Sequence, residues 1–237
     1  MSVHAPVPFP PTSLDAIVEQ AGGVRTRRDG HTVTTSYGSA AGELAACVTA
    51  VGLADCSQLT KILLDGRPDQ VRELTAALTG TELAPGGATS TAGGWWCAES
   101  ARRTWVLCEP RGDTRVRAAI AAQAVRRPGI TVTDHTTAWA TLAVVGRRTR
   151  DVLARLGVYG RSRDPRAVAP VTRHGCDGAT ATWLLQSDDE AWAVLPRADA
   201  PGLWRAIERA GQPWGLCAVG QEALARYELI RRSAVPH

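Results

Sequence analysis

Side chains that could move protons are adjacent to one another at two places in the sequence. Asp134 and His135 are adjacent, and Asp188-Asp189-Glu190 forms an acidic triplet between two short apolar stretches. Neighbours in an extended segment point to opposite faces, so Asp134 and His135 are poorly placed to act on one group, and we interpret them as a loop cap. The triplet is interpreted as a solvated hairpin turn. The alternative is that one of its acids turns inward and accepts hydrogen bonds from a basic ring system.

The aromatic surface of the chain is almost entirely indole. There are eight tryptophans and one phenylalanine, and every tryptophan falls between positions 95 and 214. Tryptophan brings a large flat surface and an N–H group that needs a hydrogen-bond acceptor. Core packing explains many of these side chains. The alternative for some of them is a flat ligand, stacked in a cleft between the two halves of the chain.

Cysteine and glycine patterns argue against several common kinds of site. The six cysteines form no Cys-x-x-Cys pair, and no histidine lies at zinc-ligand spacing from a cysteine pair. We interpret them as reduced, unreactive thiols and predict no metal site. No Gly-x-Gly-x-x-Gly stretch opens a helix, and the sequence has neither a P-loop nor a serine nucleophile elbow.

Arginine carries nearly all of the positive charge. The formal net charge is +4, and Lys61 is the only lysine. The arginines occur in scattered pairs, which favours a small anionic ligand or plain solubility over nucleic-acid binding. No apolar run is long enough to span a membrane, and the Pro-rich N-terminus lacks a signal-peptide core. We therefore expect a cytoplasmic protein without nucleic-acid or membrane partners, and a flexible arm over residues 1–12.

The elements that must position these residues follow one another in a doubled order. Strands are predicted near 60–64, 93–98, 104–108, 139–145, 183–186 and 191–196. Helices are predicted over 13–22, 40–51, 68–78, 113–125, 147–156, 201–210 and 221–232. The order strand, glycine, helix, hairpin, helix occurs twice. We predict an α+β fold of two pseudo-repeated antiparallel sheet-plus-helix units, 13–132 and 133–237, around a central cleft.

Short motifs along the chain resemble the glycine cleavage T-protein family, the tetrahydrofolate-dependent aminomethyltransferases. Its N-terminal signature resembles Tyr37-Gly38-Ser39, Glu43-Leu44-Ala45 and Val51-Gly52-Leu53-Ala54-Asp55-Cys56-Ser57, and the segments starting at Leu142, Trp204 and Gln221 follow in the family's order. The resemblance covers about residues 13–232 and implies the family's fold without its C-terminal barrel. The short form, together with residues 164–172, is more similar to the sarcosine oxidase gamma subunit, which belongs to the same family.

The resemblance implies roles for particular residues. The family's Asp-x-Ser is mainly a structural turn, so Asp55 and Ser57 are expected to satisfy backbone donors between a helix and the first sheet strand. The family's catalytic aspartate follows a Gly-Gly-x-x turn, but here Cys97 follows Gly93-Gly94-Trp95-Trp96 and no acid comes before Glu99. The catalytic residue is therefore unknown. The resemblance points to four ligand-binding residues, Trp96, Glu190, Trp192 and Gln221, with tetrahydrofolate as the cofactor.

Three functions stay open at this point. The first is an aminomethyltransferase-like protein of one-carbon metabolism that binds tetrahydrofolate or a similar flat ligand, with arginines holding the glutamate tail. The second is a non-catalytic subunit, similar to the sarcosine oxidase gamma subunit, that packs on a larger oxidase or transferase. The third is a repurposed small-molecule enzyme with a tryptophan-lined cleft. A homo-oligomer is also compatible with the missing barrel.

Overall fold

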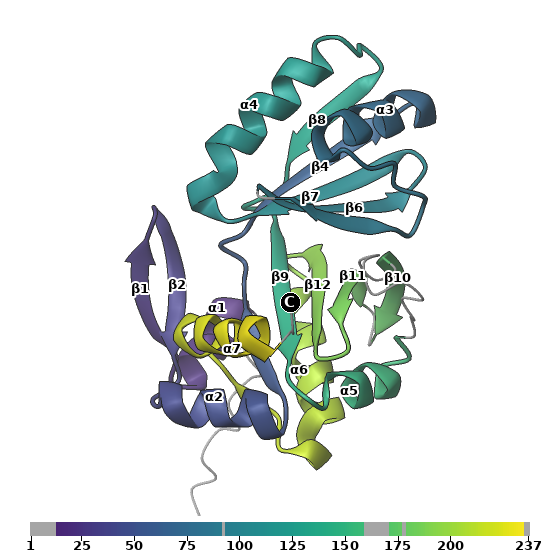
Figure 1. The fold of residues 1–237 in the computed structure, drawn as a ribbon. Helices are drawn as coiled ribbons and strands as arrows, with labels where there is room; N and C mark the ends of the chain where they lie inside the picture. Colours follow the sequence, from purple (N-terminus) through teal and green to yellow (C-terminus); the bar gives the residue numbers. More distant parts are fainter. Residues whose placement is uncertain (1–12, 92, 159–170, 177–178, 235–237) are drawn as a thin grey trace, which may run out of the picture.

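The computed structural model describes residues 13–91, 93–158, 171–176 and 179–234 (Figure 1). The predicted arm over residues 1–12, and most of the stretch 164–172, lie outside these ranges. Within them the helices are α1 (Leu14–Gln20), α2 (Ala40–Thr49), α3 (Pro68–Thr79), α4 (Asp113–Ala124), α5 (Thr149–Arg155), α6 (Ala200–Gly211) and α7 (Gln221–Ala234). Capping residues in the sequence determine where several of these helices begin or end. Ser13 and Ser39 accept hydrogen bonds from backbone amides at the starts of α1 and α2, and Gly80 closes α3 at φ 73°.

One sheet has five antiparallel strands in the order β5-β6-β7-β4-β8. They are β4 (Thr60–Gly66), β5 (Ala88–Thr91), β6 (Gly94–Ser100), β7 (Arg103–Cys108) and β8 (Ile130–Asp134). A face of this sheet carries Ile62, Trp96 and Val106, which pack with residues of α3 and α4. These two helices cover the sheet in the upper part of Figure 1.

The second sheet has six strands in the order β10-β11-β12-β9-β3-β13. They are β3 (Gly52–Asp55), β9 (Trp139–Val145), β10 (Val171–Cys176), β11 (Ala179–Ser187), β12 (Glu190–Pro196) and β13 (Cys217–Ala218). All neighbours are antiparallel except β3 and β13. A separate two-stranded ribbon, β1 (Val24–Arg28) and β2 (His31–Ser36), stands beside it at the left of Figure 1.

The two large sheets lie face to face between helices. One face of the six-stranded sheet, including Leu142 and Trp183, packs against α1, α5 and α6. Its other face carries Leu184 and Val194, which pack with Trp105 of the five-stranded sheet. The chain therefore forms helix, sheet, sheet and helix layers, with burial of apolar area between each pair as the main stabilising contribution.

Helices α2 and α7 pack together beside the six-stranded sheet, and a buried carboxylate joins them. Glu43 of α2 is 6% exposed, and it accepts hydrogen bonds from the backbone N–H groups of Tyr37 (2.6 Å) and Gly220 (2.7 Å). Gly220 is needed for this approach, because a Cβ there would lie 2.2 Å from the Thr35 carbonyl oxygen. The start of α7 is thus attached to elements from the beginning of the chain.

The α+β class is confirmed, and each predicted strand and helix has a counterpart in the structure. The prediction of two sheets missed the β1-β2 ribbon and the parallel pairing of β3 with β13. The helix predicted over 40–51 ends earlier, at Thr49, and Gly52–Asp55 forms β3, so Asp55 ends a strand instead of joining a helix to one. Three of the four residues of β3 are buried in succession, so they give no alternation from which a strand could be predicted.

The order strand, helix, three strands, helix, strand occurs at β4–β8 and again at β9–β13. The first four strands have the same order in both sheets, because β5-β6-β7-β4 corresponds to β10-β11-β12-β9. Beyond them the sheets differ, because β8 pairs with β4, whereas β3 from the first half of the chain pairs with β9. A repeat of residues and the unit boundary at 132/133 stay predictions, and any such division has to assign β3 to the later unit.

Candidate functional site

A cavity of about 590 Å³ lies where both sheets meet α7. Its walls come from the turn after β3, from β6 and the end of β7, from β9, β11 and β12, and from the side of α7. Apolar residues such as Leu59, Val145 and Leu224 line it, and about half of the lining residues are polar or charged. Cavities of this size are typical of small-molecule sites.

Two indoles form one wall of the cavity. Trp95 on β6 and Trp192 on β12 meet edge to face, with ring centroids 6.0 Å apart and an interplanar angle of 73°. They come from different sheets, so the wall depends on the face-to-face packing of the two sheets. Such a corner offers a flat surface against which a planar ligand can stack.

Glu190 is the most enclosed acid of the cavity. One of its carboxylate oxygens accepts a hydrogen bond from the Trp192 indole N–H at 3.0 Å, and the other contacts the Arg231 guanidinium. Burial raises the pKa of Glu190, and the charge of Arg231 opposes that shift. Arg231 also lies 3.4 Å from Asp189, so two carboxylates share one guanidinium. Each carboxylate oxygen has more than one acceptor position, so Glu190 can still accept from a ligand.

The acidic triplet divides into one solvated and two inward-turned residues. Asp188 is exposed and pairs with Arg150 on the surface. Asp189 accepts hydrogen bonds from the Ser187 hydroxyl and from the Tyr227 hydroxyl, and these bonds, with the charge of Arg231, outweigh its burial and lower its pKa. The solvated-turn interpretation holds for Asp188. Glu190 is turned inward, as the alternative requires, and its binding of a basic ring system stays a prediction.

The Asp134-His135 pair caps a loop, as the sequence predicts. Asp134 accepts a hydrogen bond from the Thr136 N–H at 2.8 Å and pairs with Arg117 at 2.8 Å. The His135 ring packs at 5.5 Å from Trp105 and at 5.4 Å from Trp139. Neither side chain is placed to move a proton at the cavity.

The turn after β3 forms the part of the cavity wall that contacts α7. Asp55 accepts a hydrogen bond from the Ser57 N–H at 2.9 Å, and the Ser57 hydroxyl accepts one from the Thr141 N–H at 3.2 Å. The predicted structural role of this Asp-x-Ser turn is confirmed. Gln221 of α7 donates to the Asp55 carbonyl at 3.4 Å and contacts the Cys56 sulfur at 3.6 Å.

Three of the four residues expected to bind a ligand lie around the cavity, namely Glu190, Trp192 and Gln221. Trp96 does not line it. It is 3% exposed and faces α3 and α4 on the other side of the five-stranded sheet. Side chains alternate between the faces of a strand, so its neighbour Trp95 takes the position expected of Trp96. Binding of a ligand by any of the four stays a prediction.

The acid nearest the family's catalytic position is already engaged. The Glu99 carboxylate accepts a hydrogen bond from the Thr182 hydroxyl at 2.7 Å and pairs with Arg103 at 3.2 Å. Cys97 is 2% exposed, and burial raises the pKa of its thiol. The structure therefore brings no free acid to this position of β6.

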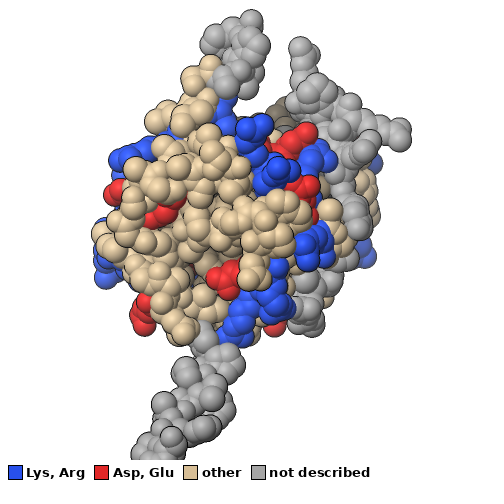
Figure 2. Space-filling model, turned by 90° about the horizontal axis from the view of Figure 1, so that it is seen from below, with Lys and Arg blue, Asp and Glu red and all other residues tan. Residues whose placement is uncertain are grey.

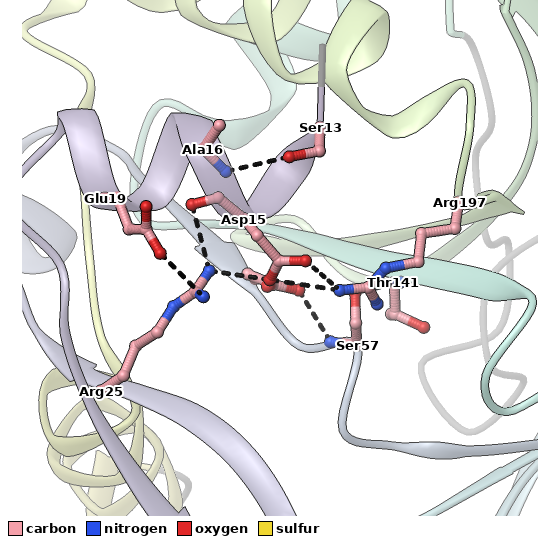
Figure 3. A network of polar contacts seen from close by, with 9 residues as sticks. Ser13, Asp15, Ala16, Glu19, Arg25, Ser57, Thr141 and Arg197 are labelled. Atoms are coloured by element: carbon pink, nitrogen blue, oxygen red, sulfur yellow. Dashed lines mark hydrogen bonds and ion pairs between the residues drawn. The ribbon is translucent and has the colours of Figure 1, made fainter. Parts of the chain in front are cut away.

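A second, smaller cavity of about 290 Å³ lies on the other side of the Ser57–Gln58 turn. Figure 3 shows Asp15 between Arg25 and Arg197, at 2.8 and 3.1 Å. Desolvation raises the pKa of Asp15, but the two guanidiniums outweigh it, so the net shift is downward. Because this cavity's arginines are held by Asp15, we interpret the cluster as a tie between α1, β1 and the end of β12.

The thiols that the structure describes agree with the sequence interpretation. The five cysteines whose side chains the structure describes are all free, and four of them are buried. Across the described ranges, no three His, Cys, Asp or Glu side chains are grouped as a metal site would require, and no helix is long and apolar enough to cross a membrane. Figure 2 shows basic residues in separate groups, several of them beside acids.

The solved structures that are similar to this chain include two with TM-scores above 0.5. The glycine cleavage system aminomethyltransferase T from Bartonella henselae superposes with a TM-score of 0.66 at 18% identity. The match covers 89% of this chain and 59% of that one, so this chain spans less than two thirds of the enzyme's length. This chain has the aminomethyltransferase fold. A chain of the heterotetrameric sarcosine oxidase from Corynebacterium sp. U-96 has a TM-score of 0.57 at 15% identity, over 76% of this chain and 94% of that one.

Sequence comparisons add nothing to the structural match. No family model matches the chain, and no curated protein matches it. The short motifs that resemble the T-protein family are therefore supported by the aminomethyltransferase fold at the level of architecture, which identities of 18% and 15% do not extend to individual residues.

Three cavity residues of this aminomethyltransferase fold were missed from the sequence. Trp95 could have been found from strand alternation, given that Trp96 was expected on one face. Arg231 and Glu109 gave no local signal, because α7 and the end of β7 meet only in the folded chain.

Proposed function

We propose that this protein binds tetrahydrofolate or a similar flat ligand in the 590 Å³ cavity, as part of one-carbon metabolism. The observation that supports this best is the Trp95–Trp192 corner beside Glu190. The indoles supply a stacking surface, and the Glu190 carboxylate supplies acceptors for the guanidine-like edge of a pterin. The cavity then corresponds to the central cleft expected between the two units.

We propose further that ordinary aminomethyl transfer is not retained. Attack of a folate nitrogen on an amine-bound methylene needs a positioned carboxylate to tune the proton transfer. Cys97 is buried at the corresponding turn, and Glu99 is engaged with Thr182 and Arg103. The chain is thus better suited to binding than to that reaction.

Calorimetry with 5-formyltetrahydrofolate tests the binding proposal. We expect saturable heat with the wild type and binding weakened by about ten-fold or more in Glu190→Ala, because a lost charged hydrogen bond costs about 1.5–3 kcal/mol. Glu222→Ala is the matched control, since Glu222 is exposed on α7 and does not line the cavity. A folded wild-type protein that gives no heat at millimolar ligand would exclude folate binding.

A second candidate function is that of a subunit in a larger oxidase. The chain covers 94% of a chain of the Corynebacterium sarcosine oxidase heterotetramer. Leu229 and Ile230 of α7 are also 66% and 45% exposed. Affinity purification from the native source, followed by mass spectrometry, tests it. Recovery of a stoichiometric flavoprotein partner supports this candidate, and recovery of the chain alone excludes it.

A further inference from the structure

The formal charges of the residues that line the 590 Å³ cavity do not sum to zero. Three carboxylates and two guanidiniums line it, which leaves one formal negative charge without a partner. Arg231 pairs with Glu190, and Arg232 pairs with Glu228. Glu109 is left over, since its carboxylate has neither a hydrogen bond nor an ion pair with any residue in the described part of the chain.

The backbone holds Glu109 at the cavity. It follows the last residue of β7, and Pro110 comes next. A residue before proline is driven toward extended backbone, and Glu109 has φ −65° and ψ 145°. Glu109 and Glu228 of α7 both line the cavity, although the Glu109 side chain is also exposed to solvent. Desolvation first, and then repulsion by Glu228, raise the pKa of Glu109, and the charge of Arg111 opposes that shift. A carboxylate at this place in the lining can act as the counter-ion of a positively charged ligand bound in the cavity.

The corner formed by Trp95 and Trp192 also suits a positively charged ligand. Trp95 and Trp192 present aromatic surface to the cavity, and an organic cation is attracted to the negative face of an indole ring. The arginines compete little for this surface, because Arg231 is shared by Glu190 and Asp189. Gln186, also a cavity residue, has a buried amide nitrogen that has no hydrogen-bond partner among the described residues, which suits an acceptor on the ligand.

We propose that the cavity selects a flat ligand carrying one positive charge, such as a protonated or quaternary nitrogen heterocycle, with Glu109 as its counter-ion and the Trp95–Trp192 pair as its aromatic wall. This goes beyond the proposed function and rests on one part of it, that the same cavity is a small-molecule site, because a folate ring itself carries no positive charge at neutral pH. A neutral ring of the same size binds without the charge contribution, and an anionic ring meets the uncompensated carboxylate.

The test uses three bicyclic probes of similar shape at pH 8, measured by calorimetry: N-methylquinolinium, quinoline and quinoline-2-carboxylate. We expect the wild type to bind the cation at least five-fold more tightly than quinoline and the anion most weakly. Glu109→Gln should abolish most of this preference and leave quinoline affinity unchanged. Glu222→Gln is the control for the loss of one negative charge on α7, away from the cavity, and should keep the preference.

Equal affinities for the cation and quinoline in the wild type overturn the proposal, as does a preference that survives in Glu109→Gln. If 5-formyltetrahydrofolate binds while the cation shows no advantage, the charge selection fails and the proposed function stands. If neither the bicyclic probes nor the folate bind, both fail. Binding of the cation with no binding of the folate supports the charge selection and removes folate from the proposed function.

Discussion

Lys61 shows how one side chain supports the loops at the cavity. It is fully buried, and its ammonium donates to the carbonyl oxygens of Leu59 (2.7 Å), Ser57 (2.9 Å) and Thr136 (3.4 Å). It therefore ties the turn after β3, which lines the cavity, to the turn between β8 and β9. A lysine in a short strand segment does not predict such a buried role, because lysine is almost never fully buried.

The first prediction concerns the pH dependence that Lys61 gives to stability. Desolvation lowers its pKa to about 8, against about 10.5 in the unfolded chain. Between these values the folded chain binds fewer protons, so the contribution of this residue to stability rises with pH by up to about 1.4 kcal/mol per unit. We expect the unfolding free energy of the wild type, minus that of Lys61→Met, to increase from pH 7.5 to pH 9.5 in urea titrations.

Using the difference between the two proteins removes the titration of groups that they share. The sign of the difference at any one pH is not part of the prediction, because removing the ammonium both relieves desolvation and leaves carbonyl oxygens unpaired. A difference that stays constant or falls over this interval would contradict it.

The tryptophan pair 95–96 marks a limit of sequence reasoning at the residue scale. The resemblance located the correct strand, but strand phase decides which of the two indoles faces the cavity. Trp96 packs among residues of α3 and α4, and Trp95 lies at Trp192. Phase could not be read from β6 because apolar residues occupy consecutive positions in it, so alternation does not separate its faces.

At the scale of elements, α7 is both a wall of the cavity and the link between distant parts of the chain. Its start is held by Glu43 through Gly220, and its later turns are held by Arg231 and Tyr227 at the β11–β12 turn. The helix itself was predictable from sequence. Its partners were not, because each contact joins residues separated by more than thirty positions.

The second prediction compares two neighbouring arginines of α7. Arg231 (29% exposed) pairs with Glu190 (17% exposed) and also donates to Ser187, whereas Arg232 (73% exposed) pairs with Glu228 on the surface. Arg231→Gln leaves an enclosed carboxylate with one neutral donor. We expect it to lose about 1–3 kcal/mol in urea unfolding, below the range for fully buried pairs because solvent screens this one. Arg232→Gln should change stability by less than about 0.5 kcal/mol.

Hydrogen exchange adds a local readout to the same pair of variants. Arg231→Gln should speed amide exchange in the last turns of α7 and in the β11–β12 turn, and leave α3 and α4 unchanged. Equal stability losses in the two variants, or faster exchange spread over the whole chain, would show that Arg231 does not hold α7 at the cavity.

At the scale of the whole molecule, the sequence predicted the elements better than their assembly. The doubled order of strands and helices is present, but β3 pairs with β9, and α1 and α2 lie with elements from the end of the chain. Strand pairing across ninety residues leaves no local pattern, so a boundary drawn from composition separates segments that share a sheet.

The last prediction follows from thiols distributed through several of these layers. Burial raises the pKa of Cys108 to about 11 and that of Cys47 to about 12, and it also raises the pKa values of Cys56, Cys97 and Cys217, all from about 9. Above pH 9 the unfolded chain releases thiol protons that the folded chain keeps. Folding stability must therefore fall as pH rises, by up to about 1.4 kcal/mol per unit for each thiol. The contribution of Lys61 to stability rises over the same range, but it involves one proton only. We therefore expect the unfolding free energy to fall between pH 9 and pH 10.5 in urea titrations with reductant.

Cys97→Ala is the matched variant, because desolvation is the only cause of the shift at Cys97. Its unfolding free energy should fall less steeply with pH than that of the wild type, by up to about 1.4 kcal/mol per unit, whatever its stability at pH 7.5. The slope separates titration from packing, since a lost sulfur in the core lowers stability equally at every pH. A wild-type curve that stays level or rises above pH 9, or a Cys97→Ala curve parallel to it, would show that these thiols titrate alike in the folded and unfolded chains.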